Sequence, residues 1–254
     1  MKKNFLRKCS ALVLTACILT AGTLSAGLTA KAEQDAPAAG TQQAGEESRW
    51  RFPAPAEAQA SYDQYLGALL DFLYRNDPQA FVALGLGTAE EAAELYNREL
   101  GLDAFCKGFT SSLGIDLPEA LINDLKMLMI RIISSARYAV SGCELQADGT
   151  YEVTVIYEQL QVFAPTMELF EAVFTELTES WYASPDSYPG NEDMMIQIIA
   201  ALFSSLRVCL DNPVYAAPAL TTVTIEPSGG AYIPNPEDLA SLEALFYDTE
   251  AVLD

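Results

Sequence analysis

The sequence predicts an α+β fold, in which helices pack on one face of a small antiparallel sheet built from two β-hairpins. Apolar residues recur at helical spacing along most of the chain after residue 60. This spacing changes to strict alternation in two stretches, 151–157 and 220–226. Each alternating stretch adjoins a glycine turn and a second strand-like run, and the helices are segregated from these hairpins. Such an order is typical of an α+β protein.

Several helices are expected before the first hairpin. Asn76-Asp77-Pro78 stops the first of them, and Pro78 can start a short helix that Asp77 caps. Thr88 and Glu91 have the spacing of a capping box. The predicted helical stretches are residues 61–75, a short helix from 78, 88–99 and 103–113.

The clearest helical pattern begins at Asp116, which is expected to cap this helix. Pro118 is tolerated because it lies in the first turn. The apolar positions on one face are Leu121, Ile122, Leu125, Leu128, Met129, Ile132 and Ile133. This stripe predicts a helix that buries one face in the core.

The first hairpin is expected to pair residues 138–146 with residues 151–157. Asp148-Gly149 joins them, and this dipeptide favours a two-residue turn because it accepts positive φ angles. The second strand alternates apolar and polar residues, so one face of the sheet is expected to pack on helices.

The second half of the chain is expected to hold two helices, a second hairpin and a last helix. Pro165 is expected to open the first helix, and Asn191 to cap the second, which ends at Asn212-Pro213. Residues 220–226 and 231–233 are the predicted hairpin. The last helix is predicted to start at Asn235-Pro236.

The first 32 residues have the layout of a bacterial secretory signal. An uncharged apolar run, residues 9–30, follows a basic start and ends in Ala30-Lys31-Ala32. The basic start consists of Lys2, Lys3, Arg7 and Lys8. We therefore expect cleavage after Ala32 and a product that is secreted or lies at the cell surface.

A lipid anchor at Cys17 is the alternative. Leu14-Thr15-Ala16-Cys17 fits the pattern in which cleavage precedes a cysteine that then carries lipid. The residues after Cys17 stay apolar as far as Leu28, whereas a lipoprotein tether usually turns polar at once. Cleavage after Ala32 is therefore favoured, and contact with the membrane is expected only through such an anchor.

Residues 33–55 are predicted to be a disordered linker, followed by one α+β domain at 56–254. The linker is rich in Ala, Gly, Gln, Pro and Glu and has no apolar periodicity. Five of the 14 basic residues lie in the signal, which has no acids, so nine remain against 35 acids, a net charge of −26. Such a surface repels nucleic acid, whose binding needs Lys and Arg to neutralise phosphate.

Three cysteines remain outside the signal: Cys106, Cys143 and Cys209. An odd number allows at most one disulfide within the chain. Small buried thiols, structural rather than catalytic, are the interpretation that the sequence favours. Their disulfide state is left open.

The residue types exclude many kinds of active site. The chain has no histidine, which excludes Ser-His-Asp and Cys-His catalysis and the histidine-containing zinc motifs. The sequence also lacks a Ser-x-x-Lys pair and the glycine motifs that bind phosphate or dinucleotides. We therefore predict no cofactor, no metal site and no catalytic residue. Hydrolysis of glycans by two carboxylates remains chemically possible.

Aromatic residues near the loop 183–190 are the one candidate for ligand binding. Trp181, Tyr182 and Tyr188 flank a loop of Pro, Ser and Asp between two predicted helices. Exposed aromatic side chains in such a loop can bind a sugar or a peptide. The competing interpretation is that Trp181 continues the buried face of its helix and the tyrosines hold the loop.

The layout resembles a family of exported or lipid-anchored proteins of unknown function in Gram-positive bacteria, some with cystatin-like or related α+β folds. The resemblance covers about residues 60–250. It rests on four segments: residues 62–71, Thr88–Glu91 with Tyr96, 148–155 and 236–239. It implies an α+β fold and export, raises the odds of lipidation at Cys17, and supplies no active-site residues.

These observations predict an exported module that binds an extracellular protein or a cell-envelope ligand and is not an enzyme. The alternative is a hydrolase that acts on glycans through two carboxylates. That alternative requires two facing carboxyl groups roughly 5–10 Å apart in a cleft lined by aromatic residues.

Overall fold

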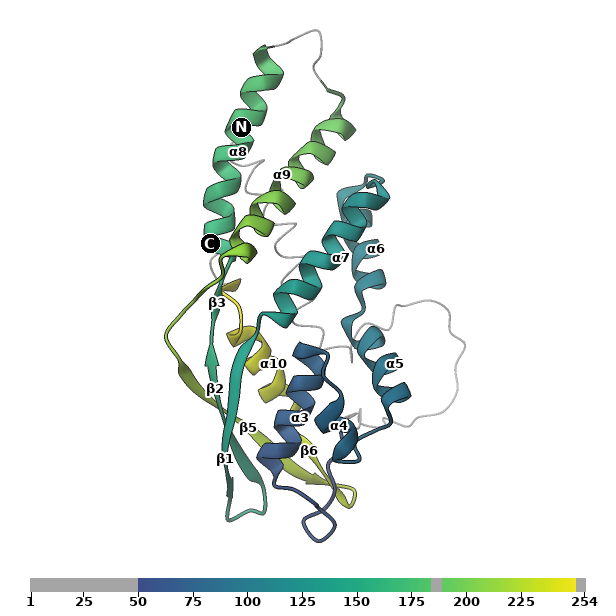
Figure 1. Ribbon diagram of the computed structural model, residues 1–254, viewed down its shortest axis with the longest axis vertical. Helices are drawn as coiled ribbons and strands as arrows, with labels where there is room; N and C mark the ends of the chain where they lie inside the picture. The colour runs from purple at the N-terminus through teal and green to yellow at the C-terminus, as the bar shows by residue number, and fades with distance from the viewer. Residues whose placement is uncertain (1–49, 184–188, 250–254) are drawn as a thin grey trace, which may run out of the picture.

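The computed structural model describes residues 50–183 and 189–249, and it has the predicted α+β fold. A four-stranded antiparallel sheet with the order β1-β2-β5-β6 holds both hairpins, as expected. Helices pack on this sheet, and two long helices extend away from it (Figure 1). The strands are β1 (Arg137–Leu145), β2 (Tyr151–Glu158), β5 (Ala219–Ser228) and β6 (Ala231–Pro234).

The buried face of the sheet follows from the alternation in the sequence. Val153 and Val155 of β2 and Val223 and Ile225 of β5 are fully buried, whereas the residues between them are more exposed. Val153 lies opposite Val223, so the two strands bury the same face. This apolar face packs on the helices, as the period of two requires.

The helices of the first half match the predicted stretches closely. Their bounds are α3 (Tyr62–Arg75), α4 (Gln79–Ala83), α5 (Ala89–Leu100), α6 (Leu102–Leu113) and α7 (Glu119–Ser134). Thr88 and Glu91 form the expected capping box of α5, and Asp77 accepts a hydrogen bond from the backbone of Gln79 at the start of α4. α3 is the central helix and contacts β1, β2, α4, α5 and α7.

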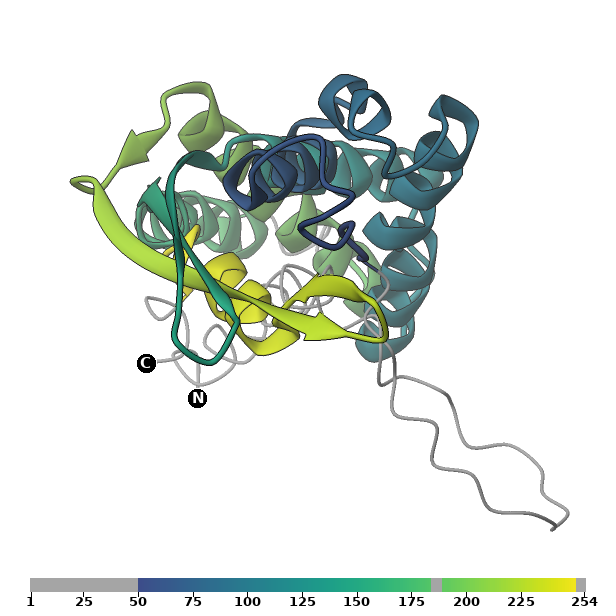
Figure 2. The same cartoon turned by 90° about the horizontal axis from the view of Figure 1, so that it is seen from below.

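The remaining helices of the described chain are α8 (Phe163–Ala183) and α9 (Asn191–Asp211), which are long, and the shorter α10 (Pro236–Leu245). α8 and α9 pack on each other and extend to the end of the molecule opposite the β1–β2 turn (Figure 1). α10 packs on β5, and Figure 2 shows it beside that strand when the molecule is seen from below. Asn235 caps α10 through the amides of Glu237 and Asp238, as the sequence predicts.

A second, two-stranded sheet was not predicted. It pairs β3 (Leu160–Gln161) with β4 (Val214–Tyr215) at the base of the α8–α9 pair. Next to it, the Asp248 carboxylate accepts hydrogen bonds from the amides of Val162, Phe163 and Ala164 at 3.0, 3.1 and 3.2 Å. A residue from the end of the chain therefore caps α8, a contact that sequence spacing cannot reveal.

Three of the predicted caps are wrong. The N-cap of α4 is Pro78 rather than Asp77, although Asp77 accepts a hydrogen bond from the Gln79 amide. Asp116 does not cap α7, because the N-cap is Pro118 and the helix begins at Glu119. Asn191 is the first residue of α9, and its N-cap is Gly190. In each case the predicted cap lies one or two positions from the observed N-cap, and helix ends are the part of a sequence pattern that is hardest to locate.

The turn of the first hairpin is also longer than predicted. Gln146 donates its backbone N–H to Thr150, so three residues, 147–149, form the loop. Only Gly149 has a positive φ, at 88°, whereas a two-residue turn of the expected type needs two such residues. The Asp148 side chain instead accepts hydrogen bonds from Thr150, which stabilises the longer turn.

The predicted linker, 33–55, extends too far toward the domain. Phe52 is 1% exposed and exchanges two backbone hydrogen bonds with Tyr232 of β6, at 2.7 and 2.9 Å. Residues 50–53 thus belong to the fold, because one aromatic side chain in the core outweighs the polar composition around it. The predicted signal and Cys17 lie outside the described residues.

By length and composition alone, α9 could cross a membrane. Its mean hydropathy is 1.6 over 18 residues, and 39% of that window is buried. A core helix passes the same test, and α9 packs on both α7 and α8. This is weak support for a membrane span.

Candidate functional site

A groove of about 620 Å³ runs between α3, α4 and the edge strand β1. Its α3 side is a row of residues spaced four apart, Asp63, Gly67, Asp71 and Arg75, which lie on one face of the helix. The opposite side is β1. The other lining residues are Gln59, Ala60, Gln64, Ala68, Ala80, Ala83, Leu84, Tyr138, Ala139 and Val140.

Small residues keep this groove open. Six of the 14 lining residues are Gly or Ala, so little side-chain volume fills the space between α3 and β1. At Gly67 an added Cβ atom would lie 3.8 Å from the Val140 side chain, an ordinary contact. Gly67 is therefore not required by the backbone conformation. A larger side chain at this or another lining position would fill part of the groove.

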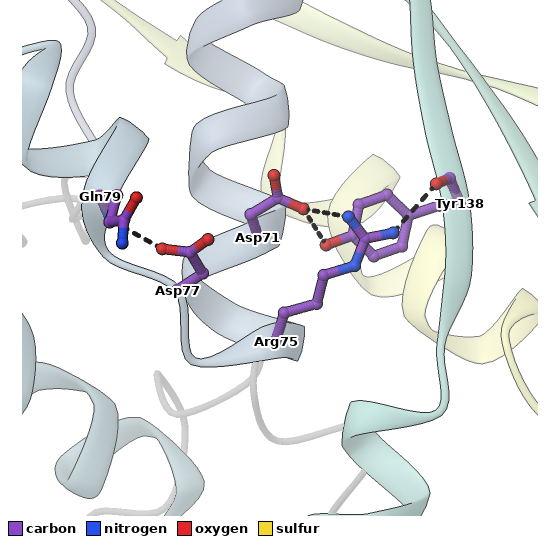
Figure 3. Close-up of polar contacts among 5 residues, drawn as sticks. All are labelled: Asp71, Arg75, Asp77, Gln79 and Tyr138. Carbon is purple, nitrogen blue, oxygen red and sulfur yellow. Dashed lines mark hydrogen bonds and ion pairs between the residues drawn. The ribbon is translucent and has the colours of Figure 1, made fainter.

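A polar cluster occupies the end of the groove nearest the C-terminus of α3. The Asp71 carboxylate accepts a hydrogen bond from Tyr138 Oη at 2.8 Å and pairs with Arg75 Nη1 at 2.7 Å, both through Oδ1. Figure 3 shows these three side chains converging between α3 and β1. The Arg75 guanidinium also lies 4.3 Å from the centre of the Tyr138 ring. The cluster joins the helix to the strand.

Burial keeps the Tyr138 phenol neutral. Loss of hydration raises its pKa far above the ordinary value, and the hydrogen bond to Asp71 and the charge of that carboxylate raise it further. Tyr138 therefore acts as a hydrogen-bond donor, and a general base is not available at this position. Asp77 and Gln79 lie on the far side of α3, where Asp77 holds the start of α4 (Figure 3).

The other end of the groove holds Asp63, in the first turn of α3. Its Oδ1 atom is shielded from solvent and accepts no hydrogen bond from any described residue. The thiol of Cys143 lies close by, and burial, followed by the Asp63 charge, raises the pKa of Cys143. This end of the groove thus carries the negative charge of Asp63, and one oxygen of that carboxylate accepts no hydrogen bond from a described residue.

The backbone edge of β1 borders the groove. β1 is the first strand of the sheet, and the Tyr138 carbonyl points away from β2, since it accepts a hydrogen bond from Arg75 Nη2 at 3.3 Å. Because backbone groups alternate between the two sides of a strand, the N–H and C=O of Val140 point the same way. Within residues 50–183 and 189–249, the Val140 backbone has no hydrogen-bonding partner beyond the β1–β2 ladder.

The predicted aromatic residues lie elsewhere. Trp181 is 9% exposed, and its Nε1 donates to Gln197 Oε1 of α9 at 3.0 Å, which fits the structural interpretation. Tyr182 is 58% exposed, and Tyr188 lies outside the described residues. Binding at these residues stays a prediction. Sequence reasoning missed the groove, although the four-residue spacing of Asp63, Gly67 and Asp71 was visible.

The cysteines and acids provide no redox or metal centre in the described part of the chain. Cys106, Cys143 and Cys209 are free thiols; Cys106 is buried and the other two are half-buried. Burial raises the pKa of Cys106, which lowers its reactivity. No group of three Cys, Asp or Glu side chains is arranged to hold a metal ion there.

Comparisons with known proteins give no match: no family model fits the sequence, and no curated protein or solved structure is detectably similar to it. The resemblance to exported or lipid-anchored proteins of Gram-positive bacteria stays an expectation.

Proposed function

We propose that this chain is an exported, non-enzymatic module that binds an extracellular partner in the groove between α3 and β1. The single observation behind the proposal is that this groove joins open volume, a strand edge with unpaired backbone groups and a carboxylate with an unfilled acceptor. Export rests on the secretory layout of residues 1–32.

The groove's chemistry favours binding over catalysis. Asp71 is already engaged by Arg75 and Tyr138. Tyr138 is held neutral by burial. Asp71 and Tyr138 are therefore both engaged in contacts within the protein. A ligand would be held by Asp63 and by the backbone edge of β1.

The geometry of the groove does not favour a glycan hydrolase. Asp63 and Asp71 lie on the same face of α3, about 12 Å apart along its axis, so they line one side of the groove and do not face each other across it. Glycosidases hold their two carboxyl groups roughly 5–10 Å apart. Trp181 also lies on α8, which does not line the groove.

Site-specific photo-crosslinking in cells that export the chain tests the proposal. A photoreactive residue at Ala83, which is exposed and lines the groove, should capture a partner, whereas the same residue at the exposed Glu168 of α8 should not. The purified partner should then bind the full chain and lose affinity for the Ala83→Trp variant, with Glu168→Trp as the matched control. Equal binding to both variants would place the site elsewhere.

Two further measurements bear on the proposal. Mass spectrometry of the exported protein should find an N-terminus at Glu33; an acylated Cys17 would instead show a lipid-anchored form. Incubation of the full chain with cell-wall glycans should give no turnover. Turnover that disappears in Asp63→Asn or Asp71→Asn would overturn the binding proposal in favour of the hydrolase.

A further inference from the structure

The backbone of β1 offers a place for one more strand. Among the described residues β1 pairs with β2 alone, and Tyr138 and Val140 of this edge strand line the groove. An extended peptide that lies along such an edge gains backbone hydrogen bonds whatever its sequence, and pockets beside the edge select its side chains. The edge and the groove together therefore suit an extended segment better than a helix or a small molecule.

The dimensions of the groove match an extended chain. α3 runs antiparallel to β1, since Arg75 contacts Tyr138, Gly67 lies opposite Val140, and Asp63 is near Cys143. Asp63 and Asp71 are about 12 Å apart along the helix. In a strand, residues i and i+4 lie on the same face and are about 13 Å apart. One face of a short strand can thus reach both ends of the groove.

The charge of the groove selects a basic segment. Its ionisable side chains include two carboxylates, Asp63 and Asp71, and only one guanidinium, Arg75, which Asp71 already pairs. Asp63 lines the groove and is half-buried, so its carboxylate can be contacted by a Lys or Arg side chain, which supplies hydrogen-bond donors and the opposite charge. The net charge of the chain, −21 before any cleavage, attracts the same class of partner from a distance.

We propose that the groove binds an extended basic peptide segment of a partner protein, which pairs with β1 as an additional strand and places a Lys or Arg on Asp63. This inference rests on the proposed function and gives the partner its chemistry. Arg75 must leave the Tyr138 carbonyl when the segment binds, and it keeps its ion pair with Asp71. The bulge at residues 141–143 ends the pairing stretch, because it turns the edge away.

The competing explanation is that the edge is only protected. A cationic side chain over an edge carbonyl and a bulge are both devices that prevent unwanted strand pairing. In that case Arg75 would stay in place, and no extended peptide would bind. Binding of an extended peptide along β1 would therefore exclude this explanation.

Selection from a displayed library of random nonapeptides on the full chain is the test. Counter-selection against the Ala83→Trp variant restricts the enriched peptides to groove binders. We expect alternating β-branched or aromatic residues with at least one Lys or Arg. No enrichment, or enrichment of acidic peptides, would overturn the inference and leave the groove's role to the crosslinking experiment.

A synthetic copy of an enriched peptide then tests the binding mode. Asp63→Asn should weaken its binding by about tenfold, because a charge-assisted hydrogen bond is lost. Glu168→Gln removes one exposed charge on α8 and should leave the affinity unchanged. An equal loss in both variants would show that only the overall charge matters, which contradicts the proposed contact.

Backbone pairing is tested on both sides of the interface. N-methylation along the peptide should weaken binding at alternate positions only, since every second amide faces β1. Val140→Pro removes the outward N–H and is tolerated on an edge strand, so it should abolish binding while circular dichroism shows an intact fold. If that variant does not fold, slowed amide exchange at Val140 on peptide binding replaces it. If the peptide binds but N-methylation has no alternating effect and amide exchange at Val140 is not slowed, strand addition is wrong. The proposal of a groove-binding module would still stand.

Discussion

The central helix of one region and the first helix of another bury very different shares of their residues. The sheet body, here α3, α4, α10 and the four-stranded sheet, contains α3, which buries nine of its 14 residues. The α8–α9 hairpin, residues 163–211, contains α8, which buries four of its 21. α3 lies among a sheet and other helices, whereas α8 packs mainly on α9 and extends beyond the body (Figure 1). Burial rather than helix length should therefore decide local stability.

The two tryptophans of the chain report on these regions separately. Trp50 lies in the sheet body, with ring contacts to Phe72 and Phe81 at 6.1 and 6.4 Å. Trp181 lies near the far end of α8 and joins it to Gln197 of α9. Variants that keep one tryptophan, Trp50→Phe or Trp181→Phe, can follow the unfolding of each region.

The largest difference is expected from matched leucine truncations. Leu69 of α3 is fully buried, so Leu69→Ala should lower the free energy of unfolding by about 3 kcal/mol. Leu177 of α8 is half-buried, so Leu177→Ala should cost about 1 kcal/mol. Urea denaturation measures both. Equal losses would mean that the hairpin is packed as tightly as the body.

High pH should destabilise the sheet body more than the hairpin. Burial raises the pKa values of Tyr62, Tyr74, Tyr138 and Tyr247, all of them outside the hairpin. Since the folded pKa values lie above the unfolded value of about 10, this stability is complete below pH 10 and is lost as the pH rises beyond it. The urea midpoint followed by Trp50 should fall between pH 9 and pH 11.

Tyr138→Phe provides the control for the alkaline effect, because it removes one of these groups. The fall in the midpoint between the two pH values should be smaller in this variant. A midpoint that does not change above pH 10 would contradict the assignment of buried neutral phenols to the body.

A smaller and more local effect is expected at the cap of α8. Asp248→Ala removes the acceptor of three amides and should cost about 1–2 kcal/mol. Amide exchange should accelerate first in residues 162–166. Unfolding of the α8–α9 region, followed by Trp181, should occur at a lower urea concentration. Asn235→Ala, which removes the cap of α10, is the matched variant in the sheet body and should be reported by Trp50. The same exchange pattern in both variants would show that the two regions open together.

The smallest effect concerns the ion pair between α6 and α7, which lie beside both regions. Lys126 Nζ contacts Asp103 Oδ1 at 2.6 Å, and this hydrogen bond and charge lower the pKa of Asp103. In Lys126→Met the pKa of Asp103 should return toward its ordinary value, as a carboxyl NMR titration would show. The urea midpoint should stay unchanged, because Asp103 is exposed to solvent and exposed pairs contribute little. A large change in the midpoint would contradict this view.

The sequence was most informative where a pattern reflects contacts within one element. The period of two at residues 151–157 and the capping box at Thr88 both describe neighbours along the chain, and the structure contains both. The caps of α7 and α9 were missed by one or two residues, since several polar residues near a helix start can satisfy the same rule. The turn between β1 and β2 is one residue longer than predicted, because Asp-Gly also fits a three-residue loop.

The candidate site was beyond such patterns. Asp63, Gly67 and Asp71 were visible as residues of a helix, but nothing in their spacing says that the edge of β1 lies beside them. Composition alone makes the aromatic residues near 183–190 candidates for binding, and Trp181 forms a contact between α8 and α9.

The sequence alone determined the fold class, the two hairpins, most helices and the acidic charge, because each depends on periodicity, local turn chemistry or composition. The tertiary structure decided which polar groups meet: Tyr138 with Asp71, 67 residues apart, and Asp248 with the start of α8, about 85 residues apart. Such contacts have no local signature, since they arise only when packing of apolar faces brings distant elements together. The groove is the space that this packing leaves beside an edge strand.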